Sequence, residues 1–106
     1  MKGICIQLQP KKSSELKKEN VLRILQSFGF SPEITEGNDD GPYINLTFDT
    51  TSITQTWSQL KHELLNCPGI ETSAIITCEG SLGWDNYLLL HHFDPSQKLD
   101  KATNHG

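Results

Sequence analysis

The order of two hydrophobic periodicities restricts the fold of this chain more than any other feature. Apolar and polar residues alternate with a period of two over residues 3–9 and 43–49, as in strands with one face on a core. Two other runs, about 14–28 and 53–64, repeat their apolar residues with the helical period instead. The sequence therefore predicts a chain that mixes strands and helices.

Residues that favour helix ends flank both helical runs. Ser13 and Ser14 offer N-caps for the first helix, and Gly29 after it suits the left-handed position of a helix stop. Ser52 and Gln55 have the spacing of a capping box at the start of the second helix. We therefore expect both runs to form helices with defined ends.

Three further segments are expected to be strands. Residues 30–36 suit a short edge strand, which the turn-forming tract 37–42 joins to the strand after it. Residues 70–79 are rich in β-branched side chains, and 87–93 is an apolar run that follows a turn over 80–86. The expected order is β-α-β-β-α-β-β.

This order resembles the ferredoxin-like plan, a split βαβ arrangement, with one additional C-terminal strand. The resemblance implies an α+β fold in which both helices cover one face of an antiparallel sheet. With right-handed crossovers, the first and third strands are central, the fourth flanks the first, and the fifth adds the outer edge. We expect one domain over residues 1–94 and, because residues 95–106 lack an apolar pattern, a mobile C-terminal tail.

Length and composition are consistent with a single domain. A chain of 106 residues buries enough surface for one core but not for two. No apolar run approaches the roughly 18 residues of a membrane helix, and no apolar signal segment opens the chain. A cytoplasmic location without a membrane partner is therefore expected. Cys5, Cys67 and Cys78 lack zinc-site spacing, so reduced thiols, no metal and no cofactor are expected.

The net charge of −4 conceals an asymmetry along the chain. Residues 1–23 hold six basic and two acidic residues, a net +4, whereas residues 24–106 hold three basic and eleven acidic ones, a net −8. An acidic protein with pI ≈ 5.4 suits phosphate backbones poorly. RNA recognition motifs also need stacked aromatic rings on two central strands, where only Tyr43 qualifies. Nucleic acid is therefore the weakest of the partner classes.

The last predicted strand is apolar on both faces although the topology makes it outermost. A second copy of the chain, another protein or the folded-back tail would have to cover it. Trp84, in the predicted turn before this strand, is a residue type enriched at binding hot spots. Alternatively, Trp84 and the leucines simply fill the two faces of the sheet. The candidate protein-binding residues are Trp84, Asp85, Tyr87, Leu88, Leu90, Asp39, Asp40 and Asp94.

A protein-binding role is the leading hypothesis, because the sequence carries none of the usual catalytic motifs. The partner would be another protein, with a basic surface in one version, or a second copy of the chain. The size and acidity are similar to those of bacterial immunity proteins and other compact inhibitors, whose negative surfaces steer them onto basic targets.

A rival hypothesis is a small enzyme or ligand-binding domain with its site on the open face of the sheet. The residues of this alternative site are His91, His92, Tyr43 and Gln7, near Asp85 and Tyr87. Neighbouring residues of a strand point to opposite faces, so His91 and His92 are not expected to share a metal ion. No catalytic residue is assigned. A nucleic-acid module that uses the basic first third is the weaker alternative.

Overall fold

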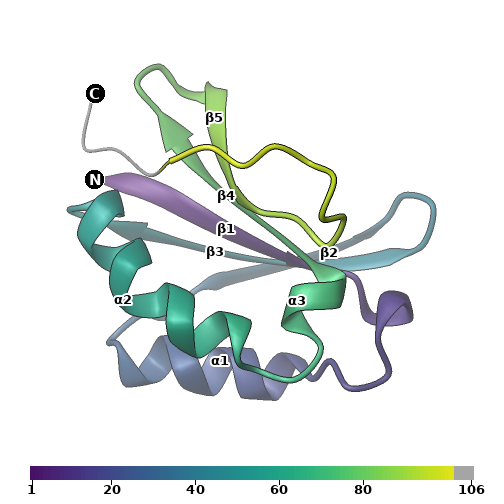
Figure 1. The fold of residues 1–106 in the computed structure, drawn as a ribbon. Helices are drawn as coiled ribbons and strands as arrows, with labels where there is room; N and C mark the ends of the chain where they lie inside the picture. Colours follow the sequence, from purple (N-terminus) through teal and green to yellow (C-terminus); the bar gives the residue numbers. More distant parts are fainter. Residues whose placement is uncertain (102–106) are drawn as a thin grey trace.

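The computed structural model describes residues 1–101, which form a five-stranded antiparallel sheet with two long helices against one face (Figure 1). The strands are β1 (Lys2–Leu8), β2 (Glu33–Asn38), β3 (Pro42–Thr50), β4 (Ala74–Gly80) and β5 (Gly83–His91). The helices are α1 (Lys18–Ser27), α2 (Ile53–Leu65) and the single turn α3 (Ile70–Ser73), with a short 3-10 helix, η1 (Pro10–Lys12), after β1. The fold is therefore α+β, as predicted.

The strands lie in the order β2-β3-β1-β4-β5, and every neighbouring pair is antiparallel. On the two sides of β1, Gln7 lies opposite Asn45 of β3 and Cys5 lies opposite Thr77 of β4. The positions of β1 and β3 in the centre, and of β4 and β5 beyond β1, agree with the predicted order. Because α1 and α2 both lie beneath the sheet, no helix of the described residues covers its other face, here called the open face (Figure 1).

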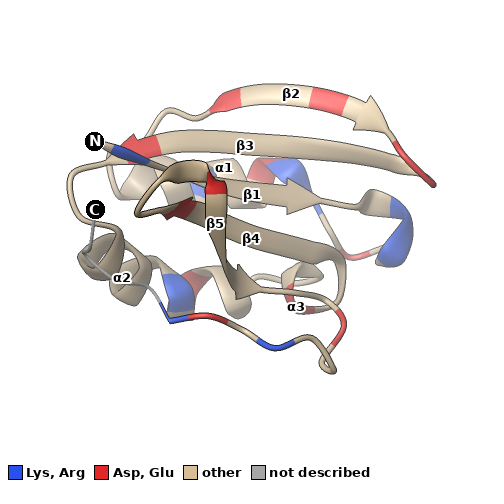
Figure 2. Ribbon diagram, turned by 90° about the horizontal axis from the view of Figure 1, so that it is seen from above, with Lys and Arg blue, Asp and Glu red and all other residues tan. Residues whose placement is uncertain are grey.

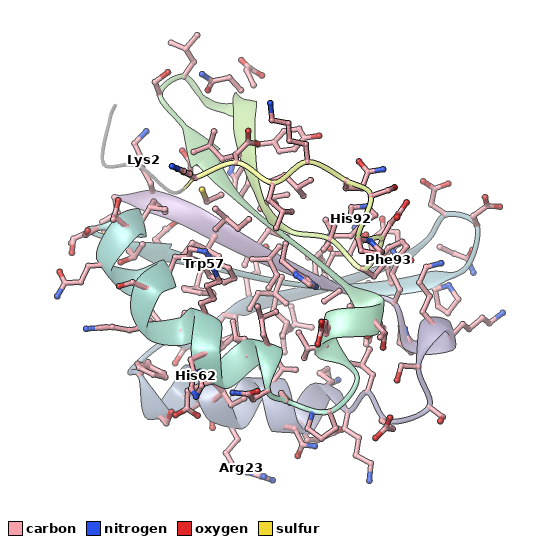
Figure 3. The ribbon with its side chains drawn as sticks, in the orientation of Figure 1. Lys2, Arg23, Trp57, His62, His92 and Phe93 are labelled. Atoms are coloured by element: carbon pink, nitrogen blue, oxygen red, sulfur yellow. The ribbon has the colours of Figure 1, made fainter. Side chains whose placement is uncertain are left out.

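The core fills the space between the sheet and the two long helices. Ile4, Ile6 and Leu8 of β1 are buried there, which is the alternation that the sequence predicts. Trp57 of α2 is buried in the same core (Figure 3). Burial of one large apolar side chain stabilises the folded state by about 1.5–3 kcal/mol. The buried side chains of this layer therefore hold the helices against the sheet.

The first helix begins later than predicted but ends where predicted. α1 starts at Lys18, and Ser13 instead closes the preceding turn, where its Oγ accepts a hydrogen bond from the Glu15 N–H at 3.3 Å. Leu16, expected on the helix, lies before it and packs against the loop that leads into α3. Because of this tertiary contact, residues that the helical pattern predicts to be part of α1 lie outside the helix. Gly29 has φ +87°, the left-handed conformation expected of the stop.

The strand expected over residues 70–79 begins only at Ala74, because α3 precedes it. Gly69 has φ +86°, and a Cβ at this position would lie 2.6 Å from the Leu16 backbone. The Ser73 hydroxyl donates a hydrogen bond to the Gly69 carbonyl and closes the helical turn. The close approach of two backbones therefore overrides the β-branched composition of this segment.

The last strand begins earlier than predicted. β5 starts at Gly83, so Trp84 lies in the strand and only Ser81 and Leu82 form the turn. Asn86 closes this turn, since its Oδ1 accepts from the Leu82 N–H at 2.8 Å and its Nδ2 donates to Ser81 Oγ at 2.9 Å. Register shifts between β4 and β5 accompany a hairpin that rises on the open-face side of the sheet (Figure 1).

The chain folds back along β5 after the strand ends. The Asp100 N–H donates to the Leu89 carbonyl at 2.7 Å, and the Leu89 N–H donates to Asp100 Oδ2 at 2.8 Å. A second copy of the chain, another protein and the folded-back tail are the three alternatives for covering the outer strand. At Leu89, the folded-back chain covers it. Within the predicted tail, 95–106, the last five residues, 102–106, lie outside the described part of the chain.

Candidate functional site

The β4–β5 hairpin exposes three large apolar side chains within six residues. The exposed fractions are 75% for Leu82, 42% for Trp84 and 57% for Tyr87, and Asp85 between them is exposed as well. We call these four residues the hairpin surface. Clustered apolar exposure marks interaction sites, whereas single exposed apolar residues are common on any protein.

Trp84 is positioned by β1. A Cβ added at Gly3 would lie 3.0 Å from the Trp84 ring, so the missing side chain at Gly3 leaves room for the indole on the open face. Next to this contact, the Gly3 N–H donates to Glu79 Oε1 at 3.0 Å. The indole is therefore supported on one side and exposed on the other.

A groove of about 420 Å³ lies on the open face next to the hairpin surface. This volume lies within the range of roughly 300–1,000 Å³ that is typical of small-ligand sites. The central strands contribute Cys5, Gln7, Asn45, Ile75 and Thr77, and β5 with the segment after it contributes Trp84, Tyr87, Leu89, His92 and Gln97. We call this space the open-face groove.

A second hollow, of about 500 Å³, continues from the groove toward the β2–β3 turn and shares Gln7 with it. Asp39 and Asp40 of the turn line this hollow together with Lys11 and Lys12 of η1. Figure 2 shows the basic residues of η1 and the acidic turn at the same end of the sheet. The acidic turn is therefore accompanied by two positive charges, which reduces its attraction for a basic partner.

The two neighbouring histidines differ in burial, although both line a further hollow beside Phe93 and Asp94. His91 is buried, and its Nε2 lies 3.1 Å from the Glu71 carbonyl oxygen. Burial lowers the pKa of His91 below its ordinary value. His92 lines the open-face groove instead, and no three His, Cys, Asp or Glu side chains within residues 1–101 converge as metal ligands.

His92 is held by its neighbours in the segment that follows β5. Its Nδ1 accepts a hydrogen bond from the Asp94 N–H at 3.0 Å, which assigns the proton of the neutral ring to Nε2. The Phe93 ring centroid lies 4.4 Å from that of its neighbour His92 (Figure 3). Lys12 Nζ lies 4.4 Å from the Phe93 centroid. These contacts fasten the segment to η1 and fix one end of the groove.

Asn45 carries the one buried side-chain oxygen or nitrogen that lacks a hydrogen-bond partner within the described residues. The atom is Oδ1, and Asn45 lines the groove. An unsatisfied polar atom of this kind costs about 1–3 kcal/mol of folding free energy. Gln7, directly opposite on β1, accepts a hydrogen bond at Oε1 from Gln9 Nε2 at 3.0 Å, which leaves its amide nitrogen as a donor.

Two of the predicted protein-binding residues serve the core. Leu90, predicted as a contact residue, is 3% exposed and packs in the core, and Leu88 is partly buried against the same core. Leu89 between them lines the groove. The leucines of β5 are therefore divided between the two faces by the alternation of a strand.

The predicted protein-binding surface is divided in space. Asp39 and Asp40 adjoin the Leu8 end of β1, whereas the hairpin turn adjoins the other end, where Lys2 Nζ donates to the Gly80 carbonyl at 2.7 Å. The two acidic residues and the hairpin surface are therefore separated by the length of the sheet. The groove and the second hollow lie between them.

Asp94 has local hydrogen-bond partners. Its Oδ1 accepts from the Ser96 N–H at 2.9 Å and from the Ser96 hydroxyl at 2.8 Å, and these bonds lower the pKa of Asp94. Its carboxylate therefore stabilises the turn after β5.

The alternative ligand site is assembled in part. Gln7 and His92 line the groove with Tyr87, and Tyr43 lines the adjoining hollow, but His91 faces away from both. Sequence reasoning missed Asn45 and Leu82. The register of the strands pairs Asn45 with Gln7, a signal that requires the pairing to be known first.

Two of the thiols lie on opposite faces of the sheet. Cys5 lines the open-face groove, whereas Cys78 is fully buried beneath the sheet. Burial, reinforced by the negative charge of Asp100, raises the pKa of Cys78 to about 11. Cys78 is therefore a packed thiol, and no disulfide joins the three cysteines, all of which are described.

Comparison with protein-family models, with curated proteins and with solved structures found no match to this chain. Within residues 1–101, no helix has both the length and the apolar character needed to cross a bilayer. A functional argument for this protein therefore depends on the geometry of its own surface.

Proposed function

We propose that this protein is a binding module that engages another protein through the hairpin surface. The observation that carries the proposal is the exposure of Leu82, Trp84 and Tyr87 within six residues of one hairpin. Tryptophan and tyrosine are the residue types that contribute most to protein interfaces when a partner desolvates them.

The supported position of Trp84 favours binding. Because the Trp84 indole already lies across Gly3, it has less rotamer freedom to lose on binding than a free surface side chain has. Association therefore costs less conformational entropy. Asp85 places a negative charge beside Trp84, and the chain as a whole carries −4. A partner with a basic rim around an apolar centre is the chemistry that this surface fits.

The proposal extends to the type of fold and to the biological role. We propose that β1 to β4 with α1 and α2 form a ferredoxin-like plan to which β5 is the additional strand, and the strand order β2-β3-β1-β4-β5 supports this. This plan hosts many unrelated activities, so it adds nothing on function. We propose an inhibitor or immunity-type role in the cytoplasm, on the grounds of size, acidity and hairpin exposure.

Capture experiments with two matched variants test the proposal. Trp84→Ala combined with Tyr87→Ala removes the apolar centre of the hairpin surface, whereas Ile34→Ala removes an apolar side chain of similar exposure, 44%, from the far edge strand β2. The wild-type protein is first used to capture a partner from the cells that produce it. We expect the amount of that partner captured to fall at least tenfold with the double variant and to stay unchanged with Ile34→Ala.

Circular dichroism first establishes that both variants fold. Equal capture by the folded double variant contradicts the proposal. For the version in which the partner is a second copy, sedimentation velocity at micromolar concentration decides: a single 11.9 kDa species excludes it, and so does a dimer that the double variant still forms.

A further inference from the structure

Among residues 1–101, no Lys, Arg, Asp or Glu lines the open-face groove. The adjoining hollow, in contrast, is lined by Lys11, Lys12, Asp39 and Asp40. A charged ligand group would lose its hydration in the groove without gaining an ion partner. The lining therefore selects for an uncharged ligand.

Two amides face each other on adjacent strands within this groove. Gln7 and Asn45 form a directly opposed pair, which places their Cβ atoms about 5 Å apart. Gln7 offers N–H donors, because its oxygen accepts from Gln9, and Asn45 offers an oxygen without a donor. The oxygen is buried in this structure, and a rotation of the Asn45 amide about its Cβ–Cγ bond would turn it toward the groove. The pair then presents a donor beside an acceptor.

The wall of the groove is aromatic. Trp84 and Tyr87 line it from β5, and their π faces suit a flat ring. His92, with its proton assigned to Nε2, adds one more donor at the end nearer η1. A planar heterocycle is the kind of ligand that stacks on these rings and also hydrogen-bonds to the neighbouring donor and acceptor.

We propose that the open-face groove binds a small uncharged ring that carries an N–H donor beside a carbonyl acceptor. The ring lies against Trp84, its N–H donates to Asn45 Oδ1, and its carbonyl accepts from the Gln7 amide. This chemistry is found in a free uracil-type base and in the same base within a nucleotide. The described lining of the groove offers no cation to pair with a phosphate, and the protein carries a net charge of −4, so the groove takes the free ring.

Titration with 1-methyluracil, followed through the backbone amide signals of the protein in solution, tests this site. We expect saturable shifts centred on Gln7, Asn45 and Thr77, with a dissociation constant in the millimolar range or tighter. As a matched ligand, 1,3-dimethyluracil has the same ring without an N–H, and we expect it to bind about tenfold more weakly. Uridine 5′-monophosphate is expected to bind more weakly than 1-methyluracil.

Three variants separate the site from the fold. Asn45→Leu and Gln7→Met keep side-chain volume and remove the polar edge, and each is expected to weaken 1-methyluracil binding about tenfold. Gln59→Met, an exposed change on α2 beneath the sheet, is expected to leave binding unchanged. Asn45→Leu is also expected to raise the melting temperature, because it removes the unsatisfied oxygen.

The absence of saturable shifts with 1-methyluracil up to ~10 mM overturns the proposal. Equal binding of the dimethylated ring, or full binding by Asn45→Leu, also overturns it. Tighter binding of uridine 5′-monophosphate contradicts the preference for a free ring. None of these outcomes depends on capture of a protein by the hairpin surface, so the two proposals fail separately.

Discussion

Single residues of this protein acquire different roles from small changes of position. His91 and His92 are adjacent in the chain, yet one is buried against the Glu71 carbonyl and the other lines the open-face groove. His91 is the last residue of β5, whereas His92 belongs to the segment after it, where its ring accepts a hydrogen bond from the Asp94 N–H. A buried neutral imidazole makes stability depend on pH.

We expect the free energy of unfolding to fall as the pH drops below about 6.5, with His91 as one cause. Its pKa in the folded protein is lowered by burial, so the unfolded chain binds the proton first. The stabilisation is complete above the ordinary histidine pKa and is lost as the pH falls through the lowered value. Urea unfolding of wild type and His91→Gln at about pH 7.5 and pH 5.5 measures it.

The His91→Gln variant should lose less stability between the two pH values than wild type does. His62→Gln, which removes an exposed imidazole from α2, provides the control and should keep the wild-type difference. An unchanged pH dependence in His91→Gln contradicts the assignment.

At the scale of elements, local sequence signals predict the ends of helices and strands well where no distant part of the backbone makes contact. Ser52 caps α2 as expected, since its Oγ accepts from the Gln55 N–H at 3.2 Å, and Gly29 ends α1. The predicted start of α1 and the predicted strand from residue 70 both failed. Both errors come from one place, where Leu16 and Gly69 meet, and a contact across more than fifty residues has no local signature.

A comparison of two glycine substitutions isolates that contact. Gly29 and Gly69 have nearly equal φ values, +87° and +86°, but a Cβ at Gly29 meets nothing within 4 Å. We expect Gly29→Ala to cost about 1 kcal/mol, the conformational penalty alone. Gly69→Ala should cost roughly 3 kcal/mol or more, because the Leu16 backbone must move.

Urea denaturation at a single pH measures both costs. Equal losses of stability would mean that the Leu16 contact gives way freely. In that case the contact would not explain why residues 70–73 form a helical turn.

For the molecule as a whole, the α+β class followed from periodicity and the expected strand order from the ferredoxin-like resemblance with right-handed crossovers, whereas the site followed from neither. Gln7, Tyr87 and His92 were predicted as site residues and do line the groove. Asn45 was missed, because its role depends on which strand lies beside β1. Leu88 and Leu90 face the core and Leu89 faces the groove, because successive side chains of β5 leave it on opposite faces.

The folded-back segment after β5 gives a prediction at this scale. Asp100 occupies the outer edge of β5, where its carboxylate accepts the Leu89 N–H. We expect Asp100→Ala to raise the hydrogen-exchange rate of the Leu89 amide about tenfold, because that N–H then opens to water. Asp100→Asn keeps an acceptor oxygen and should stay close to wild type. Equal protection of Leu89 in Asp100→Ala contradicts a role for this carboxylate.

The two tryptophans lie on opposite sides of the sheet, Trp57 in the core and Trp84 on the open face. The protein therefore carries one intrinsic fluorophore for each of its two layers. Emission that dissolved acrylamide quenches comes from Trp84 and follows occupancy of the groove or the hairpin surface. The shielded emission of Trp57 responds only when the helices separate from the sheet, so one unlabelled sample distinguishes binding from unfolding.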